Sequence, residues 1–201
     1  MELRDKNGLT YTEFMAQYKE KNYKKPSVTA DIVVLIKGDP LKVLLIKRRG
    51  HPYIGCYALP GGFSMENETI EQTAARELEE ETSIKDLPLE MVKVFSTPGR
   101  DPRTWVMDVA FVSLLDNMPK AKAGDDASRA TYFDLYVEKE GGHVKLWFED
   151  PDEGTSFGAT LLETTRSGIN GPVYDYKQLE SRLAFDHAEE IAYSLKKANL
   201  I

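Results

Sequence analysis

Residues 62–84 read GFSMENETIEQTAARELEEETSI. The part that begins at Thr69 is rich in good helix formers, and Thr69 and Gln72 have the spacing of a capping box. We therefore predict a helix over residues 69–82. At 100° per residue, Glu77, Glu80 and Glu81 occupy positions i, i+3 and i+4, so three carboxylates share one face of this helix.

Three like charges at neighbouring helix positions repel one another unless something compensates them. One interpretation is a solvated helix face, which is common for acidic runs. The other is a hard divalent cation with oxygen ligands, Mg²⁺ or Mn²⁺, which would turn the repulsion into a binding site. Gly61 and Gly62 precede the helix and end a predicted strand, and glycines let a ligand approach the backbone closely.

The spacing in residues 62–84 resembles the Nudix box, which is Gly, five residues, Glu, seven residues, then Arg-Glu-aliphatic-any-Glu-Glu-any-Gly-aliphatic. The charged and glycine positions of that pattern are filled by Gly62, Glu68, Arg76, Glu77, Glu80 and Glu81. The late glycine is replaced by Ser83, which costs about 1 kcal/mol if the backbone there is left-handed and removes no ligand. The resemblance implies a Nudix fold of the α/β class, an α/β/α sandwich with a mixed sheet.

The same resemblance implies an enzyme that hydrolyses a nucleoside diphosphate linked to another group, with Mg²⁺ or Mn²⁺ as cofactor. The metal ligands it implies are Glu77, Glu80, Glu81 and the backbone carbonyl of Gly62. The catalytic residues it implies are Glu81, Glu80, Arg76, which orients a glutamate by ion pairing, and Glu68, a supporting carboxylate. The general base stays open between Glu81 and four downstream acids: Asp125, Asp126, Glu138 and Glu140.

Residues 95–103, FSTPGRDPR, resemble ADP-ribose pyrophosphatases and their relatives in NAD metabolism. Arginine suits phosphate oxygens because it makes bidentate contacts. We expect the substrate to be bound by Arg49, Arg100, Arg103 and Phe63, although each arginine is also compatible with a solvated loop position. The resemblance implies cleavage of ADP-ribose to AMP and ribose 5-phosphate.

Two other functions are considered. A nucleoside triphosphate pyrophosphohydrolase would share the box. An ADP-ribose-sensing regulator without catalysis would bind DNA through an appended winged helix, and the 25 residues after Tyr176 look too short and too neutral for one. The intact box favours catalysis over sensing.

The remaining elements are predicted from periodicity and turn signals. The predictions are a short helix over 10–21, a hairpin of 28–37 with 41–48, strands at 57–59, 91–97, 104–115 and 131–137, and a projecting hairpin of 144–148 with 157–164. A last helix is expected to open at Asp186, capped with Glu189. His187 is expected to be a surface or capping residue.

Composition bounds the class of protein. The chain has 201 residues, 41 % of them hydrophobic, and we predict a single domain over 1–201 with an N-terminal helical extension at 1–25 and a hairpin insertion at 137–175. The net charge of −7 disfavours nucleic acid as a partner. A single cysteine excludes an internal disulfide, and no apolar run resembles a signal peptide or a membrane span. A cytoplasmic location with no membrane partner is expected.

The predicted hairpin insertion also suggests an assembly. Its apolar side chains exceed what an isolated hairpin tolerates: Leu146, Phe148, Phe157, Leu161 and Leu162. We therefore expect a homodimer in which this hairpin, with the helix over 10–21, covers part of the partner or the mouth of the site. The alternative is that the hairpin packs on its own subunit.

Overall fold

The structure, a computed structural model, describes residues 2–124 and 127–201. The helices are α1 (Tyr11–Gln17), α2 (Ile70–Thr82) and α3 (His187–Lys197). The first strands along the chain are β1 (Ser27–Ile36), β2 (Leu41–Arg48), β3 (Tyr57–Ala58), β4 (Gly61–Phe63) and β5 (Glu90–Phe95). The later strands are β6 (Val106–Leu115), β7 (Ala127–Glu140), β8 (His143–Glu149), β9 (Ser156–Gly168) and β10 (Gly171–Ser181).

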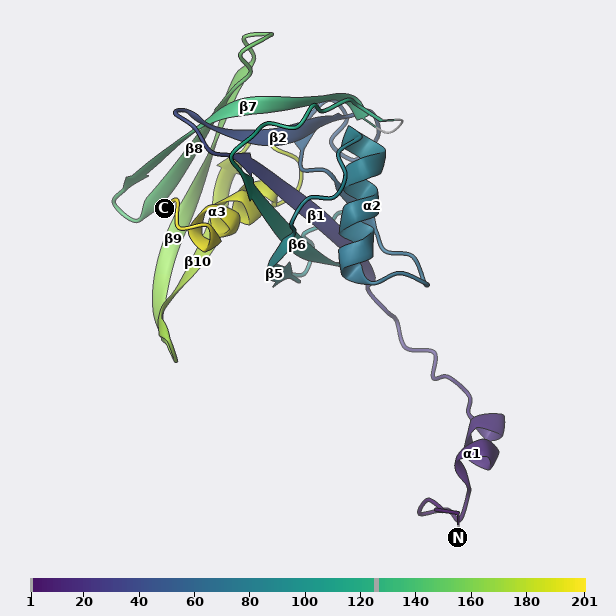
Figure 1. The fold of residues 1–201 in the computed structure, drawn as a ribbon. Helices are drawn as coiled ribbons and strands as arrows, with labels where there is room; N and C mark the ends of the chain where they lie inside the picture. Colours follow the sequence, from purple (N-terminus) through teal and green to yellow (C-terminus); the bar gives the residue numbers. More distant parts are fainter. Residues whose placement is uncertain (1, 125–126) are drawn as a thin grey trace.

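The strands form one mixed sheet in the order β10-β9-β8-β7-β2-β1-β6-β5, with β3 paired to β2 and β4 paired to β1 (Figure 1). The pair β1 and β6 is parallel, whereas the other strand pairs are antiparallel. This confirms the predicted mixed sheet.

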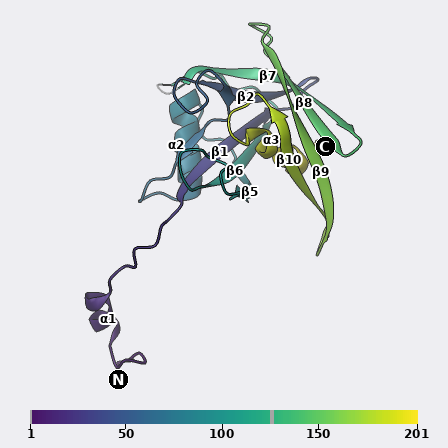
Figure 2. The ribbon, with the colours of Figure 1, turned by 180° about the vertical axis from the view of Figure 1, so that it is seen from behind.

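The two faces of the sheet carry different helices (Figures 1 and 2). Because side chains alternate along a strand, β1 sends Ile32 and Val34 into a core shared with α2, and Val33 and Leu35 into a core shared with α3. The arrangement is the predicted α/β/α sandwich.

The strands β1 and β2 pair only near their shared turn, at Leu35 with Val43 and Ile36 with Lys42 among the described residues. Farther from the turn, β4 pairs with β1 and β3 pairs with β2 instead. The two central strands therefore diverge, and the short strands β3 and β4 lie between them; β4 carries the glycine pair. Because of this divergence, the segment that leads into α2 lies at the end of the sheet where β1 and β2 no longer pair with each other.

The prediction that the hairpin over residues 144–164 projects from the domain is wrong. The strands β8 and β9 do pair with each other, but β8 also pairs with β7, so the hairpin extends the central sheet. Its apolar side chains Leu146, Phe148, Phe157 and Leu161 are buried in the chain's own core, and Leu162 is half-buried. The apolar surface that suggested a partner is thus covered within one chain.

The helix α1 is shorter than predicted and lies apart from the sheet. Its capping box between Thr10 and Glu13 is present, yet none of its residues is buried. Figure 1 shows it at the end of an extended segment that leads away from the body of the molecule, and Figure 2 agrees. No helix in the described residues is both long and apolar enough to cross a membrane.

Candidate active site

An open pocket of about 700 Å³ lies beside α2. It is lined by residues of β1, β2, β4, α2, the loop between β5 and β6, and the segment that starts α3. Of the predicted site residues, the pocket brings together Arg49, Gly62, Phe63, Arg76, Glu77, Glu80, Glu81, Arg100 and Arg103.

The guanidinium of Arg76 is the hub of this pocket. It binds both carboxylate oxygens of Glu68, at 3.0 Å from Nε and 2.7 Å from Nη2. Its Nη1 lies 2.6 Å from Glu77 Oε1 and 3.1 Å from Glu80 Oε2. Its Nη2 also donates to the backbone carbonyl of Phe63 at 3.0 Å. One arginine therefore ties the helix carboxylates to the loop before the helix, as expected from the sequence.

The pKa values around Arg76 move in opposite directions. Hydrogen bonds from Arg76, followed by one from the Met65 N–H, lower the pKa of Glu68 to about 2. Burial raises the pKa of Glu77, against the opposing effect of Arg76. Glu68 is thus a permanently charged partner of Arg76, whereas Glu77 is a desolvated carboxylate that a further cation would stabilise.

Gly62 lies directly against Glu77. A Cβ atom at Gly62 would stand 2.5 Å from the Glu77 carboxyl carbon, so no other residue fits without displacing that carboxylate. On the other side, the Gly61 N–H donates to Glu81 Oε2 at 2.9 Å. The two glycines form a backbone cradle between two carboxylates of α2.

The C-terminal end of α2 is fixed by the backbone that precedes β7. The Lys122 N–H donates to the Thr82 carbonyl at 2.8 Å, and the Gly124 N–H to the Glu81 carbonyl at 3.0 Å. These bonds satisfy carbonyls that a helix end leaves without partners. Ser83 follows with φ of 61°, the left-handed conformation expected at the position where the box has glycine.

The four predicted substrate contacts differ in their surroundings. The Arg103 side chain is 40 % exposed and bonded to Asp101, and its guanidinium lies 5.1 Å from the centre of the Phe63 ring. Arg100 is only 5 % exposed and pairs with Asp186 at 2.7 Å and with Glu190 at 2.8 Å. Its guanidinium is committed to the protein, so the placement of Arg100 does not match a solvated loop cation. Arg49 and Phe63 line the pocket.

The candidates for the general base differ in whether they line the pocket. Glu81 lines the pocket. Glu138 and Glu140 do not fit the role, because they lie in β7 outside this pocket and within 3.4 Å and 3.6 Å of Lys145 Nζ. Asp125 and Asp126 lie outside the described residues.

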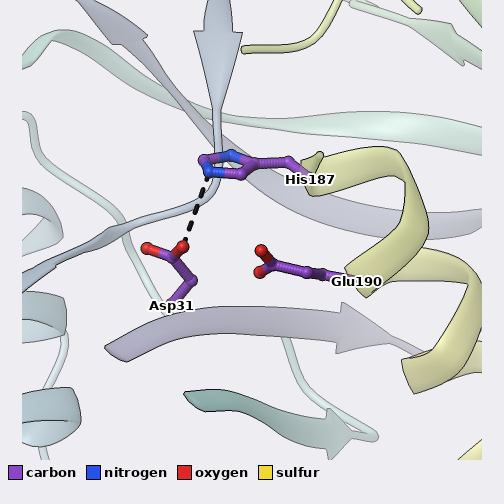
Figure 3. A group of neighbouring side chains, drawn as sticks. All are labelled: Asp31, His187 and Glu190. Carbon is purple, nitrogen blue, oxygen red and sulfur yellow. Dashed lines mark ion pairs between the residues drawn. The ribbon is translucent and has the colours of Figure 1, made fainter. Parts of the chain in front are cut away.

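A second group of ionisable side chains, which we call the floor group, was missed from the sequence. Asp31 and His187 line the pocket, and the fully buried Glu190 lies beside them. Figure 3 shows Asp31 on β1 facing His187 and Glu190 on α3. Their ligand atoms lie within 4.8 Å of one another, and all three residues are buried. Among the described residues, the glutamates of α2 do not form a group whose ligand atoms come this close to one another. His187 is therefore not the surface or capping residue expected.

The floor group already has a cationic partner, the guanidinium of Arg100. Arg100 Nη2 lies 2.8 Å from Glu190 and 4.0 Å from Asp31. His187 Nδ1 accepts the Leu59 N–H at 2.8 Å, so the hydrogen of the neutral ring sits on Nε2, which points to Asp31 at 3.5 Å. Burial, followed by Arg100 and Arg48, holds the pKa of His187 well below its usual value. Without a free imidazole lone pair and beside a guanidinium, this group is a poor metal site.

Burial also raises the pKa values of the floor carboxyls. Desolvation is the main cause for Asp31 and Glu190, and repulsion from Asp108 adds to it. For Asp108, on β6 and hydrogen-bonded to the Thr29 hydroxyl at 2.8 Å, burial raises the pKa to about 6. Arg100 opposes the upward shift of the pKa at all three carboxyls without cancelling it.

The oxygen donors beside α2 fit a hard divalent cation better. They combine carboxylates, among them a half-buried Glu77 whose pKa is raised, with a Gly62 backbone that packs directly against Glu77. Arg76 donates hydrogen bonds to both Glu77 and Glu80.

The mixed sheet between two helix layers and the acidic helix centred on Arg76, which packs against the glycine pair of β4, are the features expected of a Nudix hydrolase. The NUDIX domain model matches residues 25–148, which is more than half of the chain, so the chain belongs to the NUDIX family.

Three similar proteins span the chain to different extents. An ADP-ribose pyrophosphatase of Methanocaldococcus jannaschii is 43 % identical over 118 residues, which are 58 % of this chain and 67 % of that protein. The crystal structure of a MutT/nudix family protein from Enterococcus faecalis is 34 % identical, with a TM-score of 0.74 over 95 % of this chain and 70 % of that one. The NUDIX domain of Shewanella oneidensis NrtR, crystallised with ADP ribose, is 32 % identical, with a TM-score of 0.56 over 62 % and 82 % of the two chains.

Proposed function

We propose that this Nudix hydrolase cleaves the pyrophosphate bond of ADP-ribose, or of a related nucleoside diphosphate derivative, in a reaction that depends on Mg²⁺ or Mn²⁺. The observation that carries the proposal is the cradle of Gly61 and Gly62 against Glu77 and Glu81, two acidic residues of α2 that line the pocket together with Glu80. The names of the M. jannaschii pyrophosphatase and of the S. oneidensis domain with ADP ribose support the choice of substrate.

In this proposal, Glu77, Glu80, Glu81 and the Gly62 carbonyl hold the cation. When bound, it neutralises the pyrophosphate oxygens and lowers the pKa of a water molecule. Arg76 keeps Glu77 and Glu80 oriented through its hydrogen bonds, and Glu68 fixes Arg76 from the other side. The arginine and its four partners form a preset frame rather than groups that react.

Glu81 is our proposed general base. Its carboxylate lines the pocket, and one of its oxygens is fixed by the Gly61 N–H. A water molecule attacks phosphorus, its proton passes to the base, and the bridging oxygen leaves with the other phosphate. With ADP-ribose, the products are AMP and ribose 5-phosphate. Asp125 and Asp126 remain the alternative bases, and Asn variants of each would retain activity if Glu81 serves.

A hydrolysis screen tests the proposal. Purified protein is incubated with Mg²⁺ and, in separate reactions, ADP-ribose, NADH, sugar nucleotides and nucleoside triphosphates, and the products are separated by chromatography. We expect AMP and ribose 5-phosphate from ADP-ribose at the highest kcat/KM. Faster release of pyrophosphate from nucleoside triphosphates would contradict the proposed substrate.

A second candidate function is ADP-ribose sensing, which the likeness to the S. oneidensis NrtR domain favours. A sensor binds ADP-ribose without consuming it. Calorimetry that detects binding while chromatography detects no AMP would support sensing over hydrolysis.

We also propose that the chain works as a homodimer. The support is the exposed apolar surface of α1 and its neighbours, which includes Tyr11, Phe14, Met15 and Tyr18. Sedimentation of the full chain should show a dimer, and removal of residues 1–25 should weaken it. A species of 22.7 kDa at micromolar concentration would contradict this assembly.

A further inference from the structure

The apolar side chains of α1 form a stripe that the described part of the chain leaves exposed. Tyr11, Phe14, Met15 and Tyr18 are spaced i, i+3, i+4 and i+7, so they share one side of the helix and its C-cap. Each of the four is at least 41 % exposed. The helix has 7 residues, whereas an isolated helix in water needs about 12 to 15 to be stable. We therefore expect this set, which we call the α1 stripe, to pack on another surface.

An aromatic surface lies on the outer face of β7, β8 and β9. Tyr136 on β7 pairs with Trp147 on β8, and Trp147 pairs with Gly158 on β9. A Cβ atom at Gly158 would stand 3.0 Å from the Trp147 ring, so the glycine lets this ring lie close against the sheet. Tyr136 and Trp147 are 45 % and 46 % exposed, and all three residues line a groove of about 770 Å³. We call these three residues the aromatic shelf.

The shelf lies beyond the core that α2 covers. That core takes side chains from β1, β2, β6 and β7 and, among the described residues, none from β8 or β9. The opposite side chains of β8, such as Leu146 and Phe148, are buried in the other core. The solvated face of an antiparallel sheet is ordinarily polar. Two large aromatic side chains on that face therefore mark an interaction surface.

The α1 stripe cannot reach the shelf of its own chain. Leu135 pairs with Leu41 at the start of β2, so Tyr136 lies level with the turn that follows β1. About eleven residues of extended strand, or about 36 Å, separate that level from Ser27, where β1 begins. The nine residues 18–26, which we call the arm, span at most about 32 Å. Both views also show α1 on the side of the body away from β8 and β9 (Figures 1 and 2).

The arm and the rim of the shelf carry opposite charges. The arm reads YKEKNYKKP, with four lysines and one glutamate. Around the shelf, acids outnumber bases; the acids are Glu138, Glu140, Glu149 and Glu180, and the bases are Lys145 and Arg182. Complementary charges beside an apolar contact steer the two surfaces together and fix their register. A second copy of this chain therefore offers both an apolar stripe and a basic segment that suit the shelf.

We propose, as a deepening of the homodimer proposed above, that α1 of one copy docks its stripe on the aromatic shelf of the second copy. A helix that lies in a groove uses anchors at i, i+3, i+4 and i+7, which is the spacing of the α1 stripe. Each copy carries one stripe and one shelf, so a two-fold axis makes the contact twice. The contact holds the assembly together and is independent of which substrate the pocket beside α2 takes.

Sedimentation of full-length variants tests the contact from both sides. Phe14→Gln removes an anchor but keeps a good helix former, and Trp147→Thr removes the shelf ring but keeps a good strand former. Each variant homodimer loses this anchor at both contacts, so we expect the Kd of the dimer to rise roughly 100-fold or more. Met91→Thr is the control, because Met91 is an exposed apolar residue on β5, at the other edge of the sheet. Its Kd should match that of the wild type.

Mixing the two defective variants shows which chain receives α1. A heterodimer of Phe14→Gln with Trp147→Thr has an intact stripe on an intact shelf at one of its two contacts. We expect this heterodimer to form roughly 10-fold more tightly than either variant homodimer. Docking within one chain would give no such recovery, and its absence would overturn the proposal. Tyr136→Thr replaces Trp147→Thr in the same mixture if the latter proves unstable in thermal unfolding.

The outcomes separate this contact from the earlier proposals. A wild-type chain that is monomeric at micromolar concentration overturns both the homodimer and the docking. A wild-type dimer whose Kd is unchanged in Phe14→Gln, Trp147→Thr and Tyr136→Thr overturns the docking while the homodimer stands. If ADP-ribose is not hydrolysed but mixing restores the dimer, the proposed reaction fails while the docking stands.

Discussion

At the scale of single residues, Gly62 has no room for a side chain beside Glu77. Ala at this position would bring a methyl group to 2.5 Å from the Glu77 carboxyl carbon and push that carboxylate away from the cradle. We expect Gly62→Ala to lower kcat at least 10-fold and to raise the Mg²⁺ concentration needed for half-maximal rate. Gly50→Ala is the control, because Gly50 lines the same pocket and its Cβ would meet no atom within 4 Å. Equal rates for the two variants would contradict the steric argument.

The two arginines of the loop between β5 and β6 should respond differently to truncation. Arg100→Ala leaves Glu190 buried without its cation, so we expect the free energy of unfolding to fall by about 3 to 5 kcal/mol. Arg103→Ala should cost about 1 to 2 kcal/mol through Asp101 and should mainly raise KM for ADP-ribose. Urea unfolding and steady-state kinetics measure the two effects. A stable Arg100→Ala protein with a raised KM would return Arg100 to the role of a direct substrate contact.

The residues of the acidic helix could be predicted because their spacing is local in sequence. Glu77, Glu80 and Glu81 lie within two turns of one helix, so their shared face follows from helix geometry alone. Asp31 and His187 could not be found in that way, because 156 positions separate them and only burial between β1 and α3 brings them within 3.5 Å. The ion pairs of Arg100 could not be predicted for the same reason, because its partners Asp186 and Glu190 are distant in sequence.

At the scale of elements, the end of α2 carries a measurable strain. Ser83 has φ of 61°, a conformation that glycine adopts without penalty. Ser83→Gly should therefore raise the free energy of unfolding by about 1 kcal/mol without altering kcat. Ser83→Ala, which keeps a Cβ atom, should give no such gain. Urea denaturation decides, and a gain for Ala equal to that for Gly would contradict the backbone explanation.

The strand β10 shows where element prediction fails. Among the described strands it pairs with β9 alone, and Tyr176 is its one buried residue. Its polar residues do not alternate cleanly with apolar ones, so residues 171–181 carried no strand signal. By contrast, β1 and β2 are continuous apolar runs around a turn and were predicted nearly to their ends. The pairing of β8 with β9 was also predictable locally, but the pairing of β8 with β7 depends on the whole sheet.

At the scale of the whole molecule, the buried floor of the pocket couples stability to pH. The pKa of Asp108 is about 6 in the folded chain and 3.8 as an ordinary aspartate, so between pH 4 and 6 the folded state binds more protons than the unfolded state. Stability contributed by this group is therefore lost as pH rises through that window. Asp31 and Glu190, with raised pKa values, act in the same direction.

Asp108→Asn removes this dependence while an amide oxygen can still accept the Thr29 hydrogen bond. We expect the variant to gain stability relative to the wild type as pH rises from 4 to 7, by an amount on the order of 2 kcal/mol. The control is Asp116→Asn, because Asp116 is exposed and pairs with Lys37 at the surface. Chemical denaturation across pH measures the effect. A constant difference between Asp108→Asn and the wild type would show that Asp108 does not titrate in this window.

The central claim is that the carboxylates on one face of α2 hold the cation that hydrolysis requires. Its most direct test is the kcat for ADP-ribose at saturating Mg²⁺ in Glu80→Gln and Glu81→Gln. Glu79→Gln is the control, because Glu79 lies on the same helix but pairs with Lys85, beyond the end of α2. The account predicts that kcat falls by roughly 100-fold or more in the first two variants, which lose a charge at constant shape, and stays unchanged in the third. Folded Glu80→Gln and Glu81→Gln proteins with wild-type kcat would contradict it.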